Sequence, residues 1–125
     1  MPSPRFWKEL HAILSKHNLH STRGDHPASF ETQSKRAEIL NQGFRTLWKL
    51  GFRPESPRSF RERHMHALAA HWEEKGYKDI QTRISIFRVF GNLWLGKTNM
   101  IKASVVYVSN PDSVKRRYIT NVDKT

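Results

Sequence analysis

The segment from Ile80 to Leu95 constrains the fold of this chain most strongly. Its apolar residues recur with helical spacing but cover more than one stripe, which is typical of a helix that is contacted on several sides. They are Ile80, Ile84, Ile86, Phe87, Phe90, Leu93 and Trp94. Asp79 is a good N-cap and Gly96 ends the pattern. The segment therefore predicts a central helix over 80–95.

Three more segments have helical periodicity. Pro4 suits the first turn of a helix over 4–19. Ser29 caps a second helix over 30–50, and Ser59 can cap a third over 60–75. Residues 98–125 contain one short apolar run, predicted as a short strand or an extended tail, and then the basic cluster Lys115, Arg116 and Arg117. We expect an all-α bundle of four to five helices with an irregular C-terminal tail.

The chain is strongly basic. Its 125 residues include 22 Lys and Arg against 11 Asp and Glu, a formal charge of +11, and more than half of this excess lies after residue 75. Because the basic residues are interleaved with polar side chains on predicted helices, nucleic acid is favoured over a membrane as the partner. No apolar run reaches the ~18 residues of a membrane span, and no secretory segment is visible. We expect a cytoplasmic protein without a membrane partner.

Several chemistries are disfavoured by the residues present. The absence of cysteine excludes disulfides, cysteine zinc sites, thiol nucleophiles and iron–sulfur clusters. The seven histidines give no i, i+4 pair and no HExxH motif, so we expect no metal. The glycines form no phosphate-binding loop and no GxSxG occurs, so we expect no cofactor and no self-sufficient enzyme.

Two polar stripes are the candidate binding residues. Side chains three or four residues apart share one face of a helix, and Arg, Gln, Thr and Ser there can donate to phosphates and reach base edges. The exposed stripe near the start of the second helix is Thr32, Gln33, Lys35 and Arg36. The polar stripe on the fourth helix is Lys78, Gln81, Thr82, Ser85, Arg88 and Asn92, and Arg83 is a further candidate contact there. Arg83 has a second interpretation, in which it ties helices together.

The segment DIQTRISIFRVFGNLW, 79–94, resembles the last core helix of the core-binding domain of tyrosine recombinases, the integrases of phages and mobile elements. That helix has an Ile, two variable positions, Arg, an aliphatic, Ser, a small or aliphatic residue, Leu, Arg, a variable position and an aromatic. The positions here are Ile80, Arg83, Ile84, Ser85, Ile86, Phe87, Arg88 and Phe90. The order of the other helices agrees, and GKTNMI, 96–101, resembles the exit from that domain.

The resemblance covers 29–101 and implies a SAM-like bundle that clamps one side of duplex DNA and meets other recombinase protomers on it. Residues 1–28 would be an N-terminal helix and loop. Residues 102–125 would be a linker toward the catalytic domain, which carries the family's Arg, Lys, His and nucleophilic Tyr. Tyr107 and Tyr118 lack that setting, so we expect a domain fragment or a truncated gene product that is itself no enzyme.

Two other classes of function stay open. The turn Gly76–Lys78 could belong to a stand-alone helix-turn-helix repressor or an excision cofactor, although the fourth helix is apolar for an exposed recognition helix. The basic face could instead meet an acidic protein. RNA is not excluded, although no aromatic stacking platform is evident.

Overall fold

The computed structural model describes residues 2–19 and 27–109, and within these ranges the chain is helical without a β-strand. The elements are α1 (Pro4–His17), α2 (Phe30–Lys49), the 3-10 turn η1 (Pro57–Ser59), α3 (Glu62–Glu74), α4 (Ile80–Arg88), the π-helical segment η2 (Val89–Trp94) and the 3-10 turn η3 (Ser104–Val106). The expected all-α class is confirmed. The predicted cluster 115–117 and Tyr118 lie outside the described residues.

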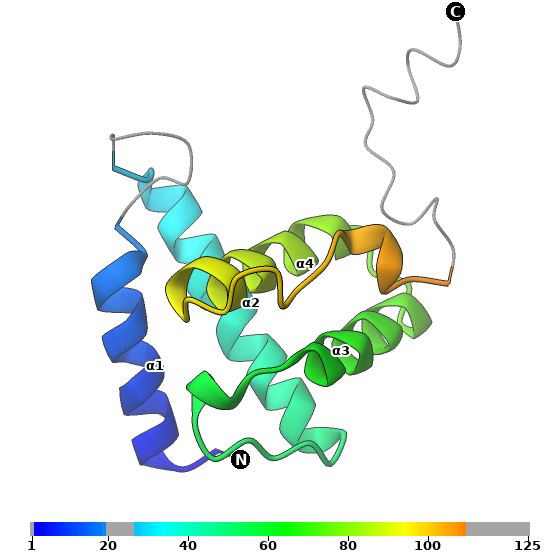
Figure 1. Ribbon diagram of the computed structural model, residues 1–125, viewed down its shortest axis with the longest axis horizontal. Helices are drawn as coiled ribbons and strands as arrows, with labels where there is room; N and C mark the ends of the chain where they lie inside the picture. Colours follow the sequence, from blue (N-terminus) through cyan, green and yellow to red (C-terminus); the bar gives the residue numbers. More distant parts are fainter. Residues whose placement is uncertain (1, 20–26, 110–125) are drawn as a thin grey trace, which may run out of the picture.

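Helix α2 runs diagonally through the bundle in Figure 1, with α1 along one side, α3 on the other side and α4 crossing it. Its start follows the prediction, because the Ser29 hydroxyl accepts a hydrogen bond from the Thr32 amide at 3.1 Å. The Ser3 hydroxyl caps α1 in the same way, accepting from the Phe6 amide at 3.3 Å. No helix in the described part of the chain is long and apolar enough to cross a bilayer.

One aromatic core joins all four α-helices. The ring of Phe44 on α2 lies edge-on to Phe6 of α1, at 5.0 Å between centroids, and to Phe87 of α4, at 5.7 Å. Gly43 permits the close crossing of α2 and α4, since a Cβ there would lie 2.4 Å from the Phe87 ring. Helix α1 therefore belongs to the same core as the helices after residue 29, through Phe6, Leu10, Ile13 and Leu14.

The third helix begins later than predicted. Ser59 does not cap it, because Pro57 starts the separate turn η1 and the fully buried Phe60 follows in an extended conformation. Arg61 takes the N-cap position, and its amide donates to Nδ1 of His64 at 2.9 Å. A buried aromatic anchor thus separates the proline-rich connection from α3.

The end of the central helix changes its winding. The predicted helix over 80–95 is α4 to Arg88 and then the π-helical η2. Gly96 ends it with φ +72°, a conformation that favours glycine. Past this point the chain turns back along α4, and the run predicted as a strand or extended tail instead contains η3 and the buried Tyr107.

Candidate nucleic-acid interface

Helix α4 exposes one face to solvent, and this face carries part of the predicted stripe. Thr82, Ser85 and Arg88 are exposed on it, and Lys78 is exposed just before the helix. Gln81 is half-buried. The opposite side of the helix packs against α2 and α3. We define the α4 face as Lys78, Thr82, Ser85 and Arg88.

No acidic residue occurs anywhere from 80 to 109. The α4 face is therefore a surface of cations and hydroxyl groups whose nearest acidic neighbour in the chain is Asp79, at the start of the helix. Such a surface can donate hydrogen bonds to an anionic ligand without repelling it.

A groove of about 450 Å³ runs along the C-terminal half of this face. Its walls are Ser85, Arg88, Val89, Asn92, Leu93, Thr98 and Asn99. Asn92 fixes the outer wall, because its side chain donates to the Ile101 carbonyl and accepts from the Ile101 amide, each at 2.9 Å. The groove thus combines a cation, hydroxyl and amide groups and one exposed aliphatic side chain, Leu93.

Sequence reasoning missed the outer wall of the groove. Thr98 and Asn99 lie after the last helical pattern, where no periodicity indicates which side chains share a face. Gly91 lets the segment approach, since a Cβ there would lie 3.1 Å from both Ile101 and Met100. The one available signal was Asn92, a polar residue among apolar ones at the end of the central helix.

The stripe predicted on α2 is only partly exposed. Thr32 and Lys35 lie on the surface, and the Lys35 ammonium is 3.6 Å from the carboxylate of Asp79 at the start of α4. The side chain of Gln33 is half-buried and donates to the Ala28 carbonyl at 2.9 Å. Lys35 therefore connects the exposed side of α2 with the α4 face, while Gln33 serves the local fold.

The expected exposure of Arg36 is wrong. The residue is only 8% exposed, and its guanidinium lies 3.5 Å from the backbone and side-chain oxygens of Asn18. It also lies over Trp94, 5.8 Å from the ring centroid, and the ring of His17 stacks on the same indole. Burial lowers the pKa of the guanidinium. Arg36 therefore joins α1, α2 and η2, and little of the residue lies on the surface.

Arg83 connects helices, as the second of its two interpretations predicted. Its guanidinium pairs with Asp79 at 2.9 Å, reaches Gln42 of α2 at 3.4 Å and lies over the rings of Trp72 and Tyr77. Asp79 occupies the N-cap position of α4 but forms no side-chain cap.

The Asp79 carboxylate instead forms ion pairs with Lys35 of α2 and Arg83 of α4. Burial alone would raise the pKa of this carboxyl, but the hydrogen bond and charge of Arg83, with Lys35 and the backbone, outweigh it and lower the pKa below its usual value. The carboxylate cancels part of the positive charge at the start of α4. The uncompensated charge of the α4 face lies toward Arg88.

Tyr107 has a structural role. Its hydroxyl donates to the Glu62 carboxylate at 2.8 Å and accepts from the Lys102 amide at 2.7 Å, which fastens the segment after η2 to α3. Burial, with the nearby Glu62 carboxylate, raises the pKa of the phenol to about 12. This shift is opposite to the activation that a tyrosine nucleophile requires.

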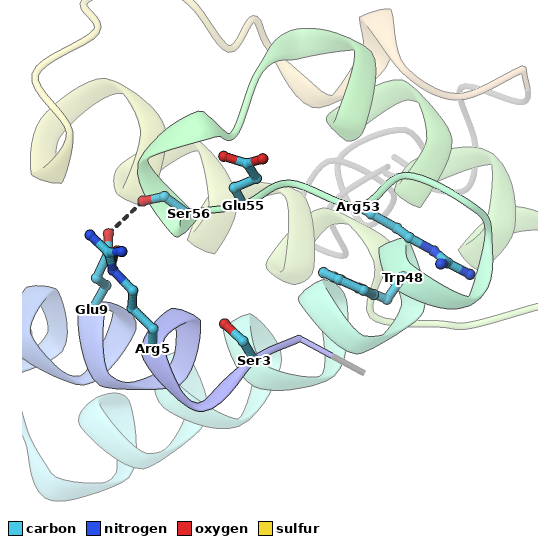
Figure 2. Close-up of a pocket in the computed structure, with 7 residues that line it drawn as sticks. All are labelled: Ser3, Arg5, Glu9, Trp48, Arg53, Glu55 and Ser56. Carbon is cyan, nitrogen blue, oxygen red and sulfur yellow. Dashed lines mark hydrogen bonds and ion pairs between the residues drawn. The ribbon is translucent and has the colours of Figure 1, made fainter.

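A second pocket, of about 410 Å³, lies between the start of α1, the end of α2 and the connection to α3 (Figure 2). Its lining is Ser3, Arg5, Glu9, Trp48, Arg53, Glu55 and Ser56. Arg53 lies over the indole of Trp48, 5.5 Å from its centroid, and Glu9 accepts a hydrogen bond from Ser56 at 2.6 Å. The lining contains two arginines and two glutamates, so the pocket has no net formal charge to attract a polyanion.

No three His, Asp or Glu side chains gather as metal ligands within 2–19 and 27–109. Comparison of the chain with family models, with curated proteins and with solved structures finds no match.

Proposed function

We propose that this chain binds duplex DNA through the α4 face, as the core-binding domain of a tyrosine-type site-specific recombinase, and positions the DNA for strand exchange by a catalytic domain. The observation that carries the DNA proposal is the set of cations and hydroxyl groups on the α4 face beside its groove, with no acidic residue between 80 and 109. The recombinase assignment rests in addition on the resemblance of residues 79–94.

The mixture of groups on this face supports DNA as the ligand rather than a partner that is attracted by negative charge alone. Arg88 can pair with a guanine edge or a phosphate, and the hydroxyls of Thr82 and Ser85 can donate to either. Leu93, 61% exposed at the end of the groove, offers an apolar contact of the kind that thymine methyl groups accept. Since α4 is packed on its other sides, these groups are held on a rigid support.

Helix α4 supports a recombinase-type module more than a helix-turn-helix regulator. It packs against α2, α3 and η3, and one narrow face remains for a ligand. A stand-alone regulator that binds as a symmetric dimer would protect two half-sites about one helical turn apart. A core-binding domain would instead occupy one continuous stretch, which a footprint on the same duplex distinguishes.

The test is fluorescence anisotropy of labelled duplexes over a series of salt concentrations. The variant removes two cations and one hydroxyl from the α4 face: Lys78→Gln, Ser85→Ala and Arg88→Gln. The matched control removes the same groups from the exposed side of α1: Lys8→Gln, Ser15→Ala and Lys16→Gln. Circular dichroism verifies that both variants keep the fold.

We expect the wild type to bind with a steep negative slope of log K against log salt, near −5 for about six phosphates. The slope of the α4 variant should be shallower by about 2, while the control keeps the wild-type slope. A wild-type slope near zero would refute DNA binding. Equal losses in the variant and the control would show that binding does not use the α4 face.

A further inference from the structure

A second group of cations lies at the start of α3, away from both predicted stripes. We define the α3 basic strip as Arg58, Arg61, Lys97 and Lys102. Arg58, Arg61 and Lys102 are exposed, and Lys97 is half-buried. These residues come from the turn η1, the N-cap of α3 and the segment after η2, so only the folded chain brings them together.

Lys97 assembles the strip. Its ammonium donates to the Arg58 carbonyl at 2.6 Å and to the Phe60 carbonyl at 3.3 Å, which holds the segment after η2 against the connection into α3. Burial lowers the pKa of Lys97, and the positive charge of Arg61 lowers it further. The charges of Lys97 and Arg61 are therefore close enough to repel each other.

No carboxylate in the described ranges forms an ion pair with the strip. Glu62 is next to Arg61 in the chain, but its carboxylate accepts the hydrogen bond from Tyr107. Folding thus brings like charges together without an ion pair to any of them, which costs stability unless an anionic partner is present. Within the described ranges, neither Arg58 nor Arg61 forms an ion pair that would stabilise the fold.

The strip is continuous with the groove beside the α4 face. Lys97 directly precedes Thr98 and Asn99, which form the outer wall of that groove. The ammonium of Lys102 donates to the Asn99 carbonyl at 2.7 Å, at the other end of the same wall. Lys97 and Lys102 therefore flank the outer wall of the groove that Arg88 also lines.

We propose that the α3 basic strip binds the sugar-phosphate backbone of the same duplex that the α4 face contacts. The inference rests on the proposed DNA binding and deepens it, by adding a second anchoring surface across the groove. The strip lies on a turn, a helix start and an irregular segment, and no regular helix face presents its side chains to base edges. It therefore supplies affinity without sequence preference.

The experiment compares two triple variants by anisotropy at several salt concentrations, on duplexes of unrelated sequence. The strip variant is Arg58→Gln, Arg61→Gln and Lys102→Gln; Lys97 is kept because it holds the segment in place. The control removes three exposed cations elsewhere: Lys8→Gln, Lys16→Gln and Lys49→Gln. Thermal unfolding verifies that both variants are folded.

We expect the strip variant to lose between 2 and 3 from the magnitude of the salt slope, at about 0.9 for each lost phosphate contact, and to lose affinity equally on all duplexes. The control should keep the wild-type slope. If the wild type binds and the strip variant keeps the wild-type salt slope, DNA binding by the α3 basic strip is refuted, while DNA binding by the α4 face is not. If the wild type does not bind duplex DNA, the proposed function fails, and the strip with it.

Discussion

The stability of this protein should fall as the pH is lowered from about 6.5 to about 4, because of His64. This residue is 2% exposed and its Nδ1 accepts the Arg61 amide, so the neutral imidazole is the form that fits the site. Burial first, and then the positive charges of Arg63, Arg61 and Lys97, lower its pKa from 6.5 to about 4. Protonation therefore opposes folding.

The pKa of His64 determines the direction and the size of the change in the free energy of unfolding. In the unfolded chain His64 binds a proton below about pH 6.5, whereas in the folded chain it does so only below about pH 4. Between these values the unfolded state holds more protons, so the free energy of unfolding decreases as the pH falls. At about 1.4 kcal/mol for each tenfold difference, the full loss is about 3 kcal/mol, a large part of the stability of a small domain.

Urea denaturation followed by tryptophan fluorescence, at pH 7.5 and pH 4.5, measures this loss. The variant His64→Asn keeps an acceptor for the Arg61 amide but cannot be protonated, so its stability should change much less over this range. His11→Asn, at an exposed position of α1, is the matched control and should behave as the wild type. An equal pH dependence in wild type and His64→Asn, or an NMR titration of His64 near pH 6.5, would refute the reasoning.

Three further perturbations test the packing and the division of roles. Gly43→Ala should lower the free energy of unfolding by about 1–3 kcal/mol, measured by urea denaturation, because its Cβ would overlap the buried Phe87 ring; an unchanged value would contradict the close crossing. Arg36→Ala should cost about 1–3 kcal/mol in the same assay yet leave the salt slope of DNA binding unaltered, and a shallower slope would show that Arg36 contacts phosphate. Tyr107→Phe should cost about 1–2 kcal/mol and increase amide hydrogen exchange at Lys102, whose amide loses its acceptor; unchanged exchange would contradict the tie.

The helices could be predicted from the sequence because their signals are local. The second helix was expected over 30–50 and is observed over 30–49, since Ser29 caps it and the period of its apolar residues continues to its end. The late start of α3 was not predictable in this way. It depends on Phe60, whose burial in the aromatic core keeps the residues before Arg61 out of the helix.

Residues of the candidate site could be predicted only where the apolar period of a single helix determines which side chains are exposed. Ser85 and Arg88 were placed correctly on the surface because the apolar period of α4 identifies its buried side. Lys35 and Arg36 look alike in the sequence, but they point about 100° apart around α2. The pocket that encloses Arg36 is built by Asn18 and Trp94, from elements distant in the chain, so no local pattern could separate the two.

The contacts of individual cations divide the positive charge of this chain into two parts. The charges of Arg36 and Arg83 are explained by the fold, because each is at least partly buried and joins elements through oxygen atoms and aromatic rings. Arg88, Arg58 and Arg61 are exposed, and no ion pair within the described ranges involves any of the three. Positive charge on the surface of a small domain repels itself, so its retention is consistent with our proposal that an extended anion such as duplex DNA binds along Arg88 and the start of α3.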